Sequence, residues 1–357
     1  MAEDSTRGPQ EFEKVLTGSA RDVASFRRDL SPVDRFQHLL HSNPAAVPLI
    51  VLVLSVLFFG ILLGSKFFSP FTMTLILQQV AITGIIGAAQ SLVILTAGIE
   101  LSVGAIMVLS SVVMGQFAFR YGVPVPLAIL AGFGVGALCG LINGWLIAYI
   151  KLPPFIVTLG TWQVFLATNY LYSANETIRS QDISAEAPLL QLFGQSFKLG
   201  GAVLTLGVVA MVVLVAVLAW VLRNTAWGRH VYAIGDDPDA AELAGVQVKK
   251  MILSVYVLSG LICALAGWVL IGRLGSVSPT SGQFANIESI TAVVIGGISL
   301  FGGRGSVMGM MFGALIVGVF NLGLRIVGTD PQWTYMLIGF LIIGAVAIDQ
   351  WIRKVSA

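Results

Sequence analysis

The feature that most constrains this chain is a succession of apolar runs, each close to the length needed to cross a bilayer. About 20 apolar residues in a helix span the hydrocarbon core. Unbroken runs favour helices over the alternating pattern of a membrane β-barrel. Only 11% of the 357 residues are charged, whereas a soluble domain carries about 25%. The sequence therefore predicts an all-α polytopic membrane protein.

About ten transmembrane helices are predicted. Their approximate bounds are 46–65, 72–96, 101–119, 125–149, 154–174, 200–222, 251–272, 287–301, 305–327 and 333–350. Together they form a transmembrane domain over 45–350, between a polar N-terminal segment, 1–44, and a C-terminal tail, 351–357. The turn after the second helix is very tight, and the eighth helix is short.

The positions of the basic residues predict which loops are cytoplasmic. With the N-terminus inside, 14 of the 20 Lys and Arg residues fall on the inner side. This is the bias expected of cytoplasmic loops. An even number of helices keeps Arg353 and Lys354 on the same side. We therefore expect cytoplasmic N- and C-termini, and the longest extracytoplasmic loop over 173–200.

A polar segment, 223–250, interrupts the apolar runs in the second half of the chain and is predicted to be cytoplasmic. Its centre predicts a short helix. Asp236 or Asp237 suits the N-cap, Pro238 the first turn and Gly245 the C-terminal end. Local chemistry alone leaves two interpretations open, a docking surface and a plain connector.

Polar side chains within apolar segments are costly, and they usually face a cavity or one another. Uncharged amides and hydroxyls beside aromatic rings suit a neutral, hydroxyl-rich solute such as a sugar. The alternative is hydrogen bonding between helices. The candidate translocation path consists of Gln90, Asn143, Thr158, Trp162, Gln163, Phe165, Asn169 and Asn321.

The tight turn after the second helix contains Gly98, Glu100, Ser102 and Gly104. Glu100 is predicted to cap the third helix, because a carboxylate is favoured at a helix N-terminus. A similar glycine-bounded run begins at Gly297, after the eighth helix.

Glycines recur every four residues in two of the predicted helices. They are Gly132, Gly136, Gly140 and Gly144 in the fourth, and Gly305, Gly309 and Gly313 in the ninth. Small residues at this spacing let helix backbones approach closely in lipid. The pattern favours packing within the chain, and the alternative is a translocation path or a dimer seam.

Catalytic signatures are absent from the sequence. There is no phosphate-binding loop, no histidine within an apolar run and no metal-ligand spacing of His and Cys. The chain is therefore predicted not to be an enzyme, not to hold a metal and not to bind ATP by a phosphate loop.

Four stretches resemble the permease subunits of ribose-type carbohydrate ABC importers. They are LTAGIELSVGA (95–105), NGWLIAYIKLPPFIVTLGT (143–161), YAIGDDPDAAELAGV (232–246) and SITAVVIGGISLFGGRGSVMG (289–309). With the helix pattern, the resemblance covers about residues 46–350. Glu100 replaces the aspartate usual in that family, and Glu288 stands where an aspartate is common, which puts the identity of the sugar in doubt.

The resemblance implies a ten-helix permease of the bacterial inner membrane that works as a pair of identical or paralogous chains. It implies a cytoplasmic ATPase subunit that holds ATP and Mg, and an extracytoplasmic binding protein that delivers a monosaccharide such as ribose, fructose or mannose. No nucleic acid is expected as a partner. By the same resemblance, a coupling helix fits a groove on the ATPase. The coupling residues are Gly235, Asp236, Asp237, Pro238, Ala240, Ala241, Gly245 and Val246.

Two other functions are kept as alternatives. A passive sugar channel or facilitator needs neither an ATPase nor a coupling segment. A related ABC permease for amino acids or nucleosides shares the general architecture, although the neutral polar residues within the helices offer no charge partners for a zwitterion.

Overall fold

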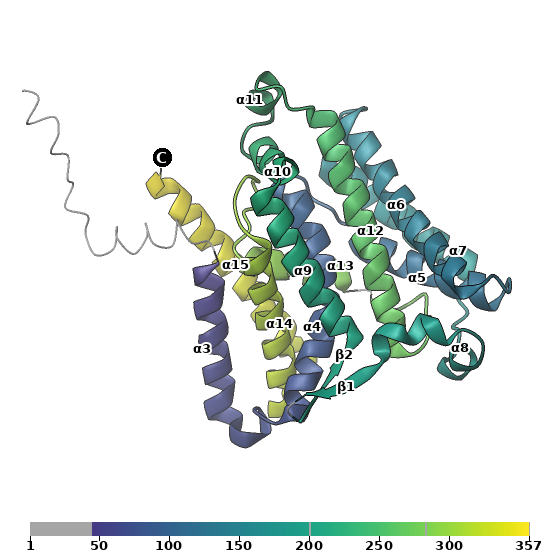
Figure 1. Ribbon diagram of the computed structural model, residues 1–357. Helices are drawn as coiled ribbons and strands as arrows, with labels where there is room; N and C mark the ends of the chain where they lie inside the picture. The colour runs from purple at the N-terminus through teal and green to yellow at the C-terminus, as the bar shows by residue number, and fades with distance from the viewer. Residues whose placement is uncertain (1–44, 200, 283, 357) are drawn as a thin grey trace, which may run out of the picture. The chain divides into compact units, whose positions relative to one another are not determined.

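The computed structural model describes residues 45–199, 201–282 and 284–356, so the N-terminal segment predicted over 1–44 lies outside the described residues. A helix is present in each of the ten segments predicted to span the membrane (Figure 1). These helices are α3 (Ala46–Leu63), α4 (Pro70–Leu95), α5 (Val103–Phe119), α6 (Val125–Ala148), α7 (Pro154–Ser173), α9 (Leu206–Asn224), α12 (Val248–Leu274), α13 (Ala285–Ile295), α14 (Val307–Val327) and α15 (Pro331–Ser356). The predicted all-α polytopic class is confirmed.

Not all ten helices have the length of a full crossing. Among the described residues, six helices are long and apolar enough to cross a membrane, namely α4, α6, α9, α12, α14, and α3 with the 3-10 turn η1 (Gly64–Lys66) that follows it. The prediction of a spanning helix over 287–301 is wrong. Helix α13 has 11 residues and rises only about 16 Å, half of the hydrocarbon thickness of ~30 Å. It ends before Gly297, whose φ of 75° is left-handed.

Helices α4 and α12 form the centre of the bundle, and about two thirds of the most apolar stretch of each is buried. Helix α12 packs against α4, α5 and α6, while α4 also packs against α9, α13 and α14. Helix α3 lies at the periphery (Figure 1), where large apolar side chains such as Ile61 are exposed. A membrane protein is expected to show such apolar exposure, because lipid covers these faces.

The regularly spaced glycines serve packing within the chain. A Cβ added to Gly136 or Gly140 of α6 would lie 2.5 Å from the Gly260 oxygen or 2.2 Å from the Tyr256 oxygen, both on α12. In α14, a Cβ on Gly313 would meet an oxygen of α13 at 2.0 Å. Backbones this close require glycine, so the packing interpretation of the pattern is confirmed.

The loop predicted over 173–200 contains structure of its own. It holds α8 (Ser180–Glu186), the 3-10 helix η2 (Pro188–Gly194) and strand β1 (Ser196–Leu199). Strand β1 pairs antiparallel with β2 (Ala202–Thr205). The sixth predicted helix therefore begins at Leu206 and not at 200.

Helix α15 continues to Ser356, so most of the predicted C-terminal tail, 351–357, is helical. The helix thus extends past the predicted membrane-spanning segment, 333–350, into residues 351–356.

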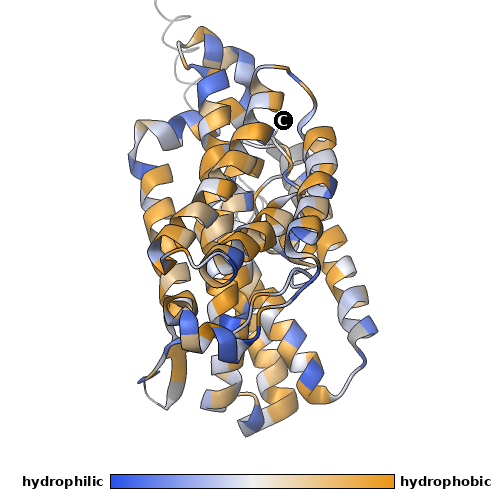
Figure 2. Ribbon diagram, turned by 90° about the vertical axis from the view of Figure 1, so that its right-hand side faces the viewer, coloured by the Kyte–Doolittle hydropathy of each residue, from blue (hydrophilic) through white to orange (hydrophobic). Residues whose placement is uncertain are grey.

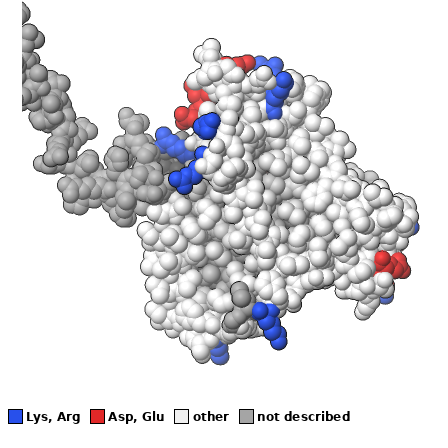
Figure 3. All heavy atoms as spheres, viewed as in Figure 1, with Lys and Arg blue, Asp and Glu red and all other residues white. Residues whose placement is uncertain are grey.

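Hydrophilic residues concentrate at the two ends of the bundle, and apolar residues dominate the helices between them (Figure 2). On the face shown in Figure 3, Lys, Arg, Asp and Glu gather at these ends, and the broad area between is uncharged. The arrangement fits a bundle that crosses a bilayer, where charged groups stay at the two interfaces.

Candidate functional site

The polar segment 223–250 folds into two short helices at one end of the bundle, α10 (Ala226–Asp236) and α11 (Pro238–Leu243) (Figure 1). Helix α11 corresponds to the helix expected from the sequence, whereas α10 was not predicted. A single residue, Asp237, separates the two helices. Because this connection is so short, a movement of α11 also moves α10.

The chemistry at the two ends of α11 explains its short length. Its N-cap is Asp237, whose Oδ1 accepts hydrogen bonds from the backbone N–H groups of Asp239 and Ala240, both at 3.0 Å. Asp236, the other N-cap candidate, is the last residue of α10. After the helix, Gly245 adopts a left-handed φ of 88°, which ends the helix without strain because it has no Cβ.

Helix α10 is fixed to the bundle by two side-chain hydrogen bonds. Trp227 donates from Nε1 to Oγ of Ser254 on α12 at 3.0 Å. The Tyr232 hydroxyl donates to the carbonyl oxygen of Gly305, just before α14, also at 3.0 Å. Burial raises the pKa of Tyr232 above its ordinary value, so the phenol keeps the proton that it donates.

Most of the predicted coupling residues lie on the surface. The exposed members are Asp236, Asp237, Pro238, Ala240 and Gly245. Val246 is half-buried, whereas Gly235 and Ala241 are buried and belong to the packing beneath. The sequence interpretation missed Leu243 of α11, which is 91% exposed. Leu243 is the single large apolar residue between Asp236 and Gly245, and this was the available signal.

The link between α4 and α5 holds a buried carboxylate. Glu100 is 1% exposed and accepts through Oε1 from the Ser102 backbone N–H at 2.7 Å and its hydroxyl at 2.5 Å. Its Oε2 accepts from Nδ2 of Asn143 on α6 at 2.9 Å. From α7, Thr158 donates to the Ile99 carbonyl oxygen at 2.9 Å. Besides α4 and α5, which it joins, the link is therefore contacted by α6 and α7.

The N-terminus of α5 is capped differently from the expectation. Glu100 binds the N–H of Ser102, which is the N-cap residue itself and precedes the first turn. Within the first turn, the N–H of Gly104 donates to Oδ1 of Asn286 on α13 at 2.6 Å. Asn286 is therefore a structural partner that the sequence interpretation missed.

The candidate translocation residues do not share one environment. Asn143 and Thr158 brace the Glu100 link, and Asn169 donates to the carbonyl oxygen of Pro279 at 2.8 Å. Gln90 is fully buried in α4, and neither of its amide atoms has a hydrogen-bond partner among the described residues. Four of the eight side chains are thus completely enclosed by protein.

The other four candidates differ in exposure. Gln163 is exposed on α7, Trp162 and Asn321 are half-buried, and Phe165 is buried. Of the whole set, Gln163 is therefore the side chain least covered by the described chain.

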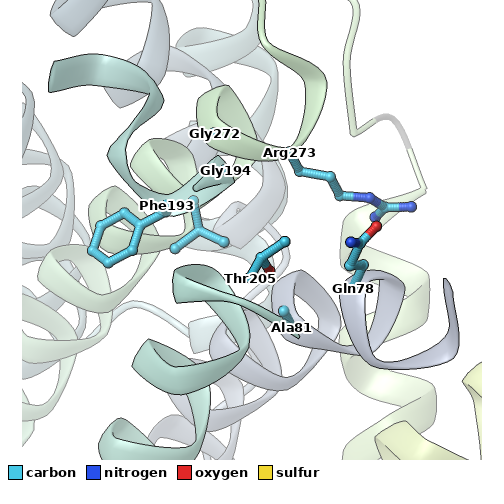
Figure 4. A pocket seen from close by; sticks show the side chains of 8 residues that line it. Gln78, Ala81, Phe193, Gly194, Thr205, Gly272 and Arg273 are labelled. Atoms are coloured by element: carbon cyan, nitrogen blue, oxygen red, sulfur yellow. The ribbon is translucent and has the colours of Figure 1, made fainter. Parts of the chain in front are cut away.

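A pocket lies near the end of the bundle opposite α11, between α4, η2, β2 and α12 (Figure 4). Its volume is about 100 Å³, and its lining residues are Gln78, Ala81, Phe193, Gly194, Thr205, Val269, Gly272 and Arg273. In Figure 4 the Arg273 guanidinium and the Gln78 amide point toward each other, and the Phe193 ring points away from them. The polar side of the pocket is therefore the side formed by α4 and the end of α12.

A second polar contact on α4 involves Glu288, the residue noted at the start of the eighth segment. Its Oε2 accepts from the Thr83 hydroxyl at 3.1 Å. Glu288 also attracts Arg273 electrostatically. Helices α4, α12 and α13 therefore contribute polar groups to one region of the bundle.

Comparison with known proteins identifies the class of this bundle. Residues 72–346 match a family described as "Branched-chain amino acid transport system / permease component". The chain belongs to this permease family. Its members are transport subunits, so the expectation of a permease and not an enzyme is confirmed at that level. No solved structure matches the chain.

Three curated relatives of this family member are import permeases. The fructose import permease protein FrcC of Rhizobium meliloti is 74% identical, over 98% of this chain and 97% of that protein. The ribose import permease protein RbsC of Bacillus subtilis (strain 168) is 39% identical, over 83% and 89%. The galactose/methyl galactoside import permease protein MglC of Escherichia coli (strain K12) is 34% identical, over 90% and 98%. The resemblance to carbohydrate permeases stated from the motifs is confirmed.

Proposed function

We propose that the chain is the membrane-spanning subunit of an ATP-driven importer for a monosaccharide, and that the monosaccharide is fructose. The observation that carries the proposal is the 74% identity to a fructose import permease over nearly the whole of both chains. The relatives named for ribose and galactose are much less similar, at 39% and 34%.

In this proposal ATP and Mg are bound by a separate cytoplasmic ATPase, which docks on α11. The exposed Leu243 and the rigid capping of α11 support this assignment. The bias of basic residues toward the same side supports cytoplasmic N- and C-termini in a bacterial inner membrane. A binding protein delivers the sugar at the opposite end, and two permease chains form the complete membrane unit.

Transport by the purified complex tests this function. We expect proteoliposomes with the permease, its ATPase and its binding protein to take up labelled fructose when ATP is supplied on the ATPase side. A non-hydrolysable ATP analogue should stop uptake, and excess unlabelled fructose should compete. Uptake that persists without ATP would instead establish the passive facilitator. Uptake of leucine or a nucleoside without uptake of fructose would establish the other class of permease.

We further propose that Gln163 contributes to the sugar path, because it is the exposed amide among the candidates. Loss of one neutral hydrogen bond, worth about 0.5–1.5 kcal/mol, should raise the KM for fructose about 2- to 10-fold in Gln163→Ala. The maximal rate and ATPase binding should be unchanged. Val164→Ala is a matched control, because Val164 is the next residue and is 59% exposed. An unchanged KM in Gln163→Ala would remove this residue from the path.

A further inference from the structure

Two links between helices in this bundle share one backbone geometry. After α4, the N–H of Gly98 donates to Val93 O at 3.0 Å, while Ala97 adopts a φ of 59°. After α13, the N–H of Ile298 donates to Val293 O at 3.2 Å, while Gly297 adopts a φ of 75°. Helix α4 and helix α13 therefore end in the same left-handed turn. The repeated glycine of the sequence, Gly98 and Gly297, is shifted by one position relative to this structural match.

The two links meet each other at the level of the backbone. The N–H of Gly303, in the link after α13, donates to the carbonyl oxygen of Leu95 at the end of α4, at 3.1 Å. A Cβ added to Gly302 would lie 2.8 Å from the backbone nitrogen of Ala97. No side chain separates the two links at these points.

Helix α10 inserts Gly235 into the same place. A Cβ on Gly235 would lie 1.8 Å from the Leu95 oxygen and 2.5 Å from the Gly303 nitrogen. On Gly302, a Cβ would lie 2.6 Å from the Gly235 oxygen. Gly235 is buried, although the next residue, Asp236, is exposed. Three backbones therefore converge within contact distance at this junction, which consists of residues 95–97, Gly235 and 302–303.

The junction is joined directly to α11. Gly235 is followed only by Asp236 and Asp237 before α11 begins. One turn earlier, the Tyr232 hydroxyl donates to the carbonyl oxygen of Gly305, which lies in the second link. Helix α10 is thus tied to the link after α13 within one turn of Gly235. Because close-packed backbone contacts transmit displacement and do not absorb it, a movement of α11 reaches both links together.

We propose that Gly235 is the positioning residue that transmits movement of α11 to the two helix-ending links at once. The link after α4 carries Glu100 and leads to α5, and the link after α13 leads to α14. Movement at one point is thereby distributed to four helices. This inference rests on the proposed function, because it requires that ATP hydrolysis on a partner moves α11.

The test measures fructose transported per ATP hydrolysed, in proteoliposomes with the ATPase and the binding protein. Gly235→Ala should lower this ratio at least about tenfold, within the ~5- to 150-fold range of coupling between sites. Co-purification of the ATPase should be unchanged, because the exposed surface of α11 is retained. Gly260→Ala is the matched control, since its Cβ would lie 2.1 Å from the Gly136 oxygen at the α6–α12 crossing. It should lower thermal stability but leave the ratio unchanged.

A milder pair of variants covers the case in which Gly235→Ala does not fold. Tyr232→Phe removes the hydrogen bond to Gly305 without adding an atom, and should lower the ratio several-fold. Trp227→Phe removes the hydrogen bond to Ser254 from the same helix, and should leave the ratio within about twofold of the original. An unchanged ratio in Tyr232→Phe, or equal losses in Gly235→Ala and Gly260→Ala, would overturn the inference. A complex without substitutions that transports no sugar with ATP would instead overturn the proposed function.

Discussion

Leu243→Asp is expected to release the partner ATPase from the permease and to abolish ATP-dependent uptake. Leu243 is 91% exposed at the end of α11, where it has no apolar cover within the described chain. Complete burial of a leucine side chain contributes about 1.5–3 kcal/mol, which corresponds to roughly 10- to 150-fold in affinity. A carboxylate at the same contact also has to lose its water. Co-purification and binding of the ATPase to immobilised permease measure the effect.

A control separates docking from folding. Leu171 is 83% exposed. It belongs to α7, a helix that lies away from α11 (Figure 1). Leu171→Asp should keep the ATPase bound with its original affinity. Both variants should elute as monodisperse protein, since neither side chain is part of the core. Retention of the ATPase by Leu243→Asp would show that α11 is a connector, the interpretation that local sequence left open.

Substitutions elsewhere in the coupling segment are less informative, because they act on its own fold. Ala241 is 4% exposed, so Ala241→Asp would force a charge into the packing beneath α11. Gly245 has a φ of 88°, which proline cannot adopt, so Gly245→Pro would rearrange the end of the helix. Either change would reduce transport without identifying a contact surface. Leu243 is the better probe because its side chain is 91% exposed and is not part of the core of the described chain.

The sequence predicted those helices whose length and ends depend on residues within or next to the helix itself. Runs of about 20 apolar residues located the helices, because the bilayer sets that length. Asp237 and Gly245 bounded α11, because an N-cap and a left-handed glycine act within one turn. Local signals were also present for two elements that were missed. Thr225 caps α10, and a Gly-Gly pair at 200–201 follows β1.

The candidate path could not be predicted in the same way, because its residues are distinguished by distant partners. Asn143 and Gln163 are both amides within apolar helices, and sequence gives them the same description. Asn143 is buried because Glu100 lies 43 positions earlier in the chain and accepts its hydrogen bond. Gln163 is exposed because no neighbouring helix covers that face of α7 within the described chain. Only the tertiary structure shows that the Asn143 amide is hydrogen-bonded between helices and that the Gln163 amide is exposed.

The second large effect is a loss of stability, and it is expected when Glu100 is replaced. In Glu100→Ala, the Ser102 N–H and hydroxyl lose their acceptor, and the Asn143 amide loses one of its two acceptors, in a site that is closed to water. Each buried donor without a partner costs about 1–3 kcal/mol, so we expect a loss of roughly 3–5 kcal/mol. That is a large part of the 5–15 kcal/mol that stabilises a typical domain. The measurement is the thermal midpoint in detergent, together with the yield of monodisperse permease.

Glu100→Gln distinguishes the hydrogen bonds of this carboxylate from its charge. The glutamine oxygen can still accept from Ser102, while its amide nitrogen faces the Asn143 amide. Oδ1 of Asn143 has no partner among the residues described, so a half-turn of that amide presents it as an acceptor. This rotation of the Asn143 amide breaks its 3.0 Å hydrogen bond to the Ser102 hydroxyl. The expected loss of stability is therefore only about 1 kcal/mol. Equal destabilisation by Ala and Gln would mean that the negative charge holds the link. A mild effect of Gln beside a severe effect of Ala would mean that the acceptor atoms do.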